Sequence, residues 1–192
     1  MSRLDDAELV QPADRAEWRR WLAANHGSSP GVWIVNYTKA SGKQQFSYED
    51  IIEELLCYGW VDSTARKLDH ERAMLYVAPR KKDSTWAATN KTRVERLVAN
   101  GLMTHAGMAV IDRAKANGSW SILDPVEALE IPSDLREAFD NNPEVAERYE
   151  ALGTGGKKQV LWSVVSAKRA ETRAARIAAI VARGQAEESL LP

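Results

Sequence analysis

The sequence predicts an α+β fold, with a small, mostly antiparallel sheet and flanking helices in the N-terminal part, followed by a helical C-terminal subdomain. Three observations lead to this prediction. β-Branched and aromatic residues gather in three short runs, all of them before residue 80. From there onwards, apolar residues repeat at helical spacing. The 192 residues are also 44% hydrophobic, which is enough to form a substantial core.

A helix and a strand are expected first along the chain. Within residues 14–24, Trp18, Trp21 and Leu22 follow one another at i, i+3 and i+4, which is the apolar stripe of an amphipathic helix. Residues 31–37 are rich in β-branched and aromatic side chains and lie between Ser-Pro and Ser-Gly pairs. Such a run is typical of a largely buried strand.

A second helix and a β-hairpin are expected next. Ser47 and Asp50 have the spacing of a capping box, and the helix that they begin should close at Gly59. Residues 60–68 and 72–78 are two extended segments joined by a short polar turn. We expect them to pair as the two strands of a hairpin.

The pattern becomes helical after Pro79. Asn90 is a good N-cap residue for a helix that ends before Gly101, and residues 107–116 predict another helix. We therefore expect the sheet to be complete before this part of the chain.

Charge marks the expected boundary between the two parts. Residues 121–152 carry nine acidic and two basic side chains, a net charge of −7, whereas residues 153–183 carry one acidic and seven basic, a net charge of +6. The acidic helices should therefore lie near the basic one, within one chain or between two copies. We expect an α+β domain at 1–120 and a helical subdomain at 121–192.

The basic C-terminal segment is expected to form one long helix, with small and apolar residues on one face and basic residues on the other. The inner face should hold Val160, Val164, Ala167, Ala174, Ala178 and Val181. The outer face should hold Lys158, Trp162, Arg169, Arg173 and Arg176. The leading interpretation of the outer face is structural, as a solvated stripe or as salt bridges to the acidic segment. The alternative is a second basic surface for an anion or a partner, made of Lys168, Arg169, Arg173 and Arg176.

Composition excludes several classes of protein. The formal net charge is −1, which argues against a dedicated nucleic-acid binder. Cys57 is the single cysteine, so no internal disulfide can form and a reducing cytoplasm is the natural location. The first residues turn acidic where a signal peptide needs a basic and then an apolar stretch. The longest apolar run is far below the roughly 18 residues of a membrane span, so we expect neither secretion nor membrane insertion.

Familiar catalytic and cofactor motifs are not expected to operate here. His26, His70 and His105 are scattered, so we predict no metal site, and we expect no cofactor. Residues 153–158 contain the glycines and lysines of a phosphate loop in the wrong pattern, and they are better interpreted as a linker between helices. Cys57 resembles a small core residue, and no serine lies in a nucleophile elbow.

The densest polar cluster surrounds the predicted hairpin. If its strands pair, Asp62 at the start and Arg80 just past the end come close together. Arginine can bind a carboxylate or phosphate with two parallel bonds, and a tryptophan ring can stack on a planar ligand. The predicted ligand-binding residues are Trp60, Asp62, Arg80, Lys81, Ser84, Trp86, Asn90 and Lys91. The alternative is structural: Asp62 pairs with Arg80, and the tryptophans belong to the core.

Four ordered motifs resemble the bacterial YdeI/OmpD-associated family. They are GWVDS at 59–63, APRKKDSTW at 78–86, NK at 90–91 and GLMTHAG at 101–107. The segment AKRAETRAARI at 167–177 is similar to the closing helix of that family, so the resemblance covers nearly the whole chain. It implies a cytoplasmic bacterial protein linked to bacteriocin protection and to stress resistance, and it supplies no catalytic residues.

The leading functional hypothesis is a non-catalytic binding or protective protein that holds an anionic small molecule or a peptide, with a protein partner left open. One alternative is an enzyme on a small anionic substrate, in which Asp62 is the general base while Arg80 and Lys81 stabilise negative charge. A weak nucleic-acid binder is the third reading, because residues 64–100 have a net charge of +5. The overall acidity makes nucleic acid the least favoured partner.

Overall fold

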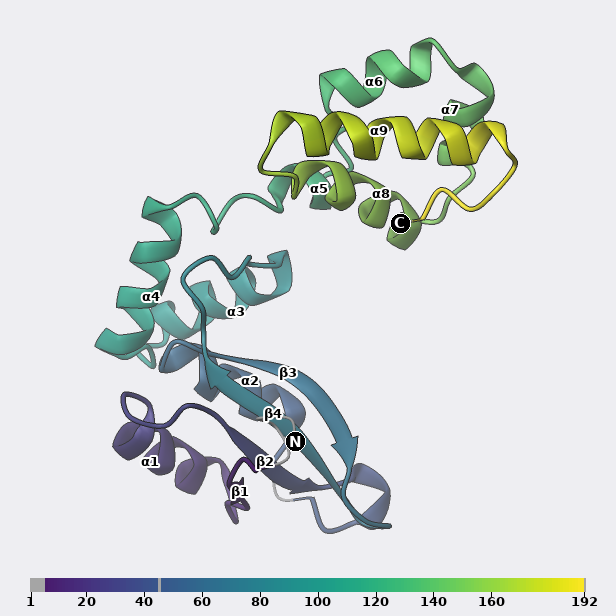
Figure 1. The fold of residues 1–192 in the computed structure, drawn as a ribbon. Coiled ribbons are helices and arrows are strands. Elements are labelled where there is room, and N and C mark those ends of the chain that lie inside the picture. The colour runs from purple at the N-terminus through teal and green to yellow at the C-terminus, as the bar shows by residue number, and fades with distance from the viewer. Residues whose placement is uncertain (1–5, 45, 192) are drawn as a thin grey trace. The chain divides into compact units, whose positions relative to one another are not determined.

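The computed structural model describes residues 6–44 and 46–191, and it confirms the α+β class (Figure 1). Contacts divide the chain into two compact units. The N-terminal unit comprises Met1–Ser84 and Thr89–Gly118, and the C-terminal unit comprises Thr85–Ala88 and Ser119–Pro192. The domain boundary predicted at residue 120 stays a prediction, because compactness alone does not show independent folding.

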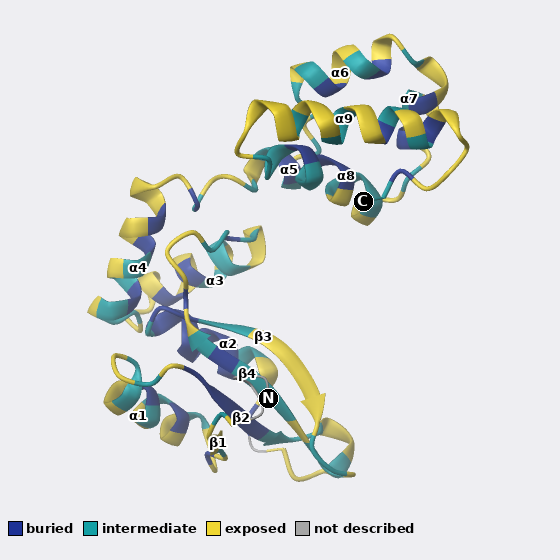
Figure 2. Cartoon of the chain, viewed as in Figure 1, coloured by how far each residue is buried: buried dark blue, intermediate teal, exposed yellow. Residues whose placement is uncertain are grey.

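The sheet of the N-terminal unit has four strands in the order β1-β2-β4-β3. The strands are β1 (Leu9–Val10), β2 (Val32–Tyr37), β3 (Trp60–Lys67) and β4 (Arg72–Pro79). β1 runs parallel to β2, and the other neighbours are antiparallel. The predicted strand and hairpin are therefore confirmed, whereas the two-residue β1 was not predicted. Figure 2 shows β2 buried along most of its length and β3 largely exposed.

Two helices pack with this sheet, and their ends agree with the local signals in the sequence. α1 (Arg15–Asn25) begins after Asp14, whose side chain accepts from the backbone N–H of Glu17. α2 (Tyr48–Cys57) begins with the predicted capping box of Ser47 and Asp50. It closes at Gly59, whose φ of +72° is readily adopted only by glycine.

The core of the N-terminal unit lies between α1, α2 and the sheet. Trp18 and Leu22 are fully buried on α1, as the predicted stripe requires. The Trp18 ring stacks on Trp21 at 5.3 Å, and Trp21 meets the edge of Trp60 at 5.9 Å. These aromatic pairs join α1 to the start of β3 and fix the place where the hairpin begins.

α3 (Ala88–Ala99) and α4 (His105–Ala116) differ slightly from the prediction. The expectation that Asn90 caps α3 is wrong, because the helix starts at Ala88 and Asn90 is its third residue. α4 starts two residues early, after Thr104, whose side chain accepts from the backbone N–H of Gly107. A Cβ at Gly107 would lie 2.4 Å from the Cys57 carbonyl oxygen, so glycine allows α4 to approach the end of α2 closely.

The described part of the C-terminal unit is helical. Its helices are α5 (Asp124–Glu127), α6 (Ser133–Asp140), α7 (Pro143–Glu150), α8 (Thr154–Val165) and α9 (Ala170–Gln185). The largest fully buried side chains of this unit are those of Trp86, Tyr149, Leu135 and Leu161. α9 contacts α6, α7 and α8, so the acidic helices do lie beside the basic one within a single chain.

The prediction of one long terminal helix is wrong. Residues 166–169 separate α8 from α9, and the four non-helical residues change the phase of the wheel. As a result Ala174 and Ala178, expected on the inner face, are exposed, whereas Arg173 and Arg176 are half-buried against the rest of the unit.

The interpretation of residues 153–158 as a linker is wrong as well. Gly153 is the N-cap of α8, and residues 154–158 form its first turns. Lys157 and Lys158 there pair with Glu150 and Glu127 of the acidic helices. Across the described residues, no helix is both long enough and apolar enough to cross a membrane.

Candidate ligand-binding sites

The hairpin brings part of the predicted cluster together at the start of β3. Trp60 pairs with Pro79, so Asp62 and Arg80 lie on adjacent strand ends. Both line one small space with Asn90 of α3. Side chains of α2, including Leu55, close this space, which is too small to hold a water molecule. The three polar residues therefore converge as predicted, but they do not enclose a cavity.

Arg80 is buried beneath this surface, with only 6% of the residue exposed. Burial lowers the pKa of its guanidinium to about 10, although the negative charge of Asp62 opposes that effect. Arg80 therefore still carries its positive charge at neutral pH, close to the carboxylate of Asp62.

Asp62 has a partner that the sequence did not reveal. The hydroxyl of Tyr48, in the first turn of α2, donates to Asp62 Oδ2 at 2.8 Å. Burial and the nearby Asp62 raise the pKa of Tyr48 to about 12, so the hydroxyl keeps its proton at neutral pH. Arg93 is a second missed neighbour, because its Nη1 donates to Asn90 Oδ1 at 2.9 Å. Nothing local in the sequence signals the contact of Tyr48 with Asp62, because α2 and β3 meet only in the folded chain, whereas Asn90 and Arg93 are only three residues apart on α3.

The two tryptophans of the predicted cluster are both buried, each with 1% exposed. Trp60 Nε1 donates to the carbonyl oxygen of His26 at 3.1 Å. Trp86 belongs to the C-terminal unit, where its ring lies 4.9 Å from that of Trp120. The surface members of the predicted set are Lys81, which is exposed, and Ser84 and Lys91, which are half-exposed.

Residues 80–84, called the basic loop below, are anchored by two elements of the N-terminal unit. The Arg80 backbone N–H donates to Gly59 O at 3.0 Å. From the end of α4, Arg113 Nη2 donates to Arg80 O at 3.4 Å, and Asn117 Nδ2 donates to Lys82 O at 2.9 Å. These bonds hold the loop beside Arg113, while the side chains of Lys81 and Lys82 remain exposed.

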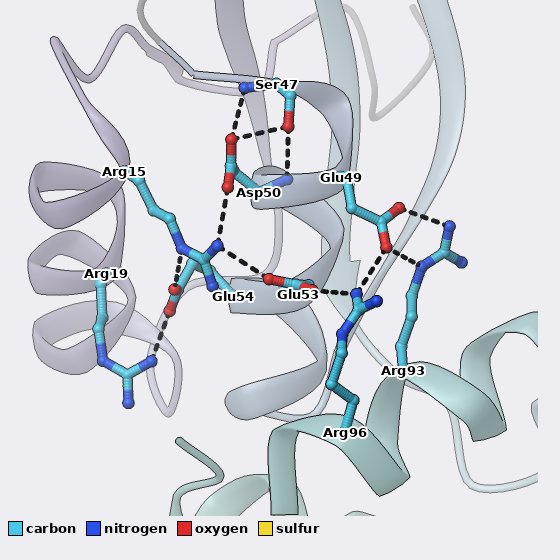
Figure 3. A network of polar contacts seen from close by, with 9 residues as sticks. All are labelled: Arg15, Arg19, Ser47, Glu49, Asp50, Glu53, Glu54, Arg93 and Arg96. Carbon is cyan, nitrogen blue, oxygen red and sulfur yellow. Dashed lines mark hydrogen bonds and ion pairs between the residues drawn. The ribbon is translucent and has the colours of Figure 1, made fainter. Parts of the chain in front are cut away.

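A larger charge network, which the sequence analysis missed, surrounds α2 (Figure 3). Carboxylates of α2 pair on one side with arginines of α1 and on the other side with arginines of α3. The carboxylates are Glu49, Asp50, Glu53 and Glu54, and the arginines are Arg15, Arg19, Arg93 and Arg96. We call these eight residues the α2 charge network.

Glu54 is the most buried member of the α2 charge network, with 2% exposed. Its two carboxylate oxygens accept from Arg15 Nε and Arg19 Nη1, both at 2.7 Å. A buried carboxylate is tolerated when it is paired and hydrogen-bonded in this way. The network therefore joins α1, α2 and α3, and its charges already neutralise one another.

Cys57, at the end of α2, is an inert thiol. Burial raises its pKa to about 11, and the negative charge of Glu54 adds to that effect. Because the thiolate is the nucleophile, this cysteine is unreactive at neutral pH. No group of three or more His, Cys, Asp or Glu side chains that could hold a metal ion exists among the described residues.

The residues of the predicted second basic surface have separate environments. Arg173 binds both oxygens of Asp134, at 2.6 and 2.8 Å, and Val164 O at 3.2 Å. Arg176 Nη1 donates to Ser163 O and, at 2.9 Å, to Ser166 Oγ. Arg173 is thus a salt-bridge residue, as the structural interpretation holds, whereas Arg176 faces a pocket.

This C-terminal pocket has a volume of about 330 Å³ and lies between α8, α9 and the segment after α9. It is lined by Ser163, Ser166, Arg176, Ala179, Ile180, Arg183 and Leu190. The pocket could not be predicted from the sequence, because it depends on the break between the two helices.

Two family models match the chain. One is described as a domain of unknown function (DUF8412) and matches residues 10–110. The other is described as "Bacteriocin-protection, YdeI or OmpD-Associated" and matches residues 128–185. The resemblance predicted from the sequence is therefore confirmed in the C-terminal part, while the motifs at 59–107 fall within the other model. No curated protein and no solved structure matches the chain.

Proposed function

We propose a non-catalytic binding role for this chain, which belongs to the DUF8412 family and carries a bacteriocin-protection, YdeI or OmpD-associated domain at residues 128–185. The proposed ligand is an anionic small molecule or peptide, and its proposed site is the basic loop. The proposed role in the cell is protection against bacteriocins or stress, in the bacterial cytoplasm, where a lone cysteine such as Cys57 stays reduced.

The observation that carries this proposal is the anchoring of the basic loop. Bonds from Arg113 and Asn117 to its carbonyl oxygens hold the backbone of the loop, and the side chains of Lys81 and Lys82 are exposed. A loop that is already ordered loses less conformational entropy when it binds a ligand. Lysine and arginine together provide several donors for carboxylate or phosphate oxygens.

The surroundings of Asp62 favour binding over turnover. A general base must reach the proton that it removes, but Oδ2 of Asp62 already accepts from Tyr48, and the space beside it is closed. Arg80 lies under the same surface, where its charge supports an anion bound at the loop without direct access to it.

Thermal unfolding of the full chain tests the proposal. The panel contains a nucleotide, a sugar phosphate, a dicarboxylate, and acidic and basic peptides. At about 100 times its dissociation constant, a ligand adds roughly 2.7 kcal/mol to the free energy of unfolding and so raises the Tm. We expect an anionic member to do so with the wild type, and the shift to be lost in Lys81→Gln/Lys82→Gln.

The matched control is Lys39→Gln/Lys67→Gln, which removes the same charge from two other exposed positions of the N-terminal unit. It should keep the full shift. A panel that leaves the wild-type Tm unchanged, or a shift that survives in Lys81→Gln/Lys82→Gln, contradicts the proposal. Chemical conversion of the bound compound would instead favour the enzyme hypothesis with Asp62 as the base.

A further inference from the structure

The C-terminal pocket carries an inference that is independent of the basic loop. Two guanidinium groups, those of Arg176 and Arg183, line it together with an apolar floor formed by Ala179, Ile180 and Leu190. All of these residues belong to the C-terminal unit, within or just after the matched domain.

Both guanidinium groups bind neutral oxygens of the protein. Arg176 Nη1 donates to Ser163 O and Ser166 Oγ, and Arg183 Nη1 donates to Leu191 O at 2.5 Å. Within residues 6–44 and 46–191, neither group pairs with a carboxylate. Because a guanidinium has five N–H donors, both arginines keep donors and a full positive charge for a ligand.

The serine hydroxyls have different roles at this pocket. Ser163 Oγ donates to Val160 O at 2.7 Å, so its proton is already used. Ser166 Oγ accepts from Arg176. Its own proton is therefore directed elsewhere and can be donated to an oxygen bound beside the guanidinium.

The segment after α9 shows which chemistry the pocket accommodates. The side chain of Leu190 is buried on the floor, with 3% exposed, and the carbonyl oxygen of the next residue, Leu191, accepts from Arg183. A branched aliphatic group and an oxygen acceptor thus already lie side by side there. A ligand with the same two features, and a negative charge on its oxygens, would match the unused donors.

We propose that the C-terminal pocket binds a carboxylate that carries a short branched apolar chain. The carboxylate bonds to Arg176, Arg183 and the Ser166 hydroxyl, and the chain packs on Ala179 and Ile180. A volume of about 330 Å³ lies at the small end of ligand pockets, which suits one such group. The same chemistry occurs in a free branched-chain acid and in the last residue of a peptide that ends in leucine.

Calorimetric titration of the full chain tests this proposal with 4-methylpentanoate and its uncharged amide, 4-methylpentanamide. The amide has the same shape but lacks the charge that strengthens hydrogen bonds to a guanidinium. The acid should bind with a Kd at least tenfold lower than that of the amide. This comparison uses the wild-type protein alone, so it decides the matter even if a variant does not fold.

Two variants locate the binding. Arg183→Gln should raise the Kd for the acid at least tenfold, with circular dichroism showing that the protein remains folded. Arg169→Gln removes the same charge at an exposed position just before α9 and should change the Kd less than twofold. Lys81→Gln/Lys82→Gln should also bind as the wild type does, which separates this pocket from the basic loop.

Titration with the peptide Ala-Ala-Leu, with a free or an amidated C-terminus, distinguishes a free acid from a peptide C-terminus as the source of the ligand. Tighter binding of the free peptide than of 4-methylpentanoate identifies a peptide C-terminus, and the reverse order identifies a free acid. Equal binding of acid and amide, an unchanged Kd in Arg183→Gln, or tighter binding of inorganic phosphate than of the acid would overturn the proposal.

Discussion

The arginines of the α2 charge network and those of the C-terminal pocket do opposite things. Arg15 and Arg19 bind the carboxylate of buried Glu54, so their charges are paired within the protein and join α1 to α2. Arg176 and Arg183 bind only neutral oxygens among the described residues, and both line a cavity. The difference shows that an arginine's partners, more than its exposure, indicate whether it stabilises the fold or is available to a ligand.

The predicted cluster around Arg80 lies between these two cases. Arg80 is more deeply buried than Arg15. Its pKa is lowered to about 10, so burial has a larger effect on this pKa than the attraction of Asp62 has. The exposed lysines of the basic loop, and not Arg80 itself, are therefore the groups that a ligand would reach first.

The largest expected effect comes from breaking the α2 charge network. Glu54→Gln replaces the buried carboxylate with a neutral amide. Arg15 and Arg19 then lose the buried negative charge that both of them bind. We expect the free energy of unfolding to fall by about 3 kcal/mol, as measured by urea denaturation. Glu95→Gln, on the exposed side of α3, is the control and should change it by less than about 0.5 kcal/mol.

The same measurement on the C-terminal pocket sharpens the comparison. Arg183→Gln removes one bond to the Leu191 carbonyl, so it should lower the free energy of unfolding by only about 1 kcal/mol. An Arg183→Gln effect as large as that of Glu54→Gln would mean that the pocket arginines are structural too.

A smaller effect is expected from pH. The bond with Arg93 lowers the pKa of Glu49. Burial raises the pKa of Asp50, but bonds from Ser47 and Arg15 lower it by more, so the net shift of this pKa is also downward. A carboxyl group whose pKa is lower in the folded state stabilises the protein above its unfolded pKa, and that contribution is lost as the pH falls through the folded pKa. The free energy of unfolding should therefore decrease as the pH falls below about 5.

Urea denaturation at several pH values between 6 and 3 checks this dependence. The double variant Glu49→Gln/Asp50→Asn should show a flatter decrease than the wild type, whereas Glu95→Gln should retain the wild-type slope. An unchanged slope in the double variant would show that these two pairs do not contribute to acid sensitivity.

Local signals predicted much of the N-terminal unit. The capping box of Ser47 and Asp50 and the hairpin both depend on residues close together in sequence, and each is confirmed. The convergence of Asp62 and Arg80 followed from the hairpin register alone. The ligand role of that cluster stays a prediction.

Features that depend on contacts between residues far apart in the sequence, or on how helices pack, could not be predicted from it. Glu54 meets Arg15 and Arg19, which are 39 and 35 residues away, so no local spacing reveals the pairs. The break between α8 and α9 contains no proline or glycine, and a wheel drawn through it placed Arg176 on the wrong face. The closure of the space beside Arg80 depends on how α2 packs, which periodicity does not specify.

The most direct test of the contrast between the two sets of arginines is to observe their side-chain N–H signals by NMR during a titration with 4-methylpentanoate. We expect the Nε–H resonances of Arg176 and Arg183 to shift with one common saturation curve, and those of Arg15 and Arg19 to stay unchanged. Shifts of all four together, or of none, would contradict the assignment of paired arginines to the fold and of the pocket arginines to a ligand.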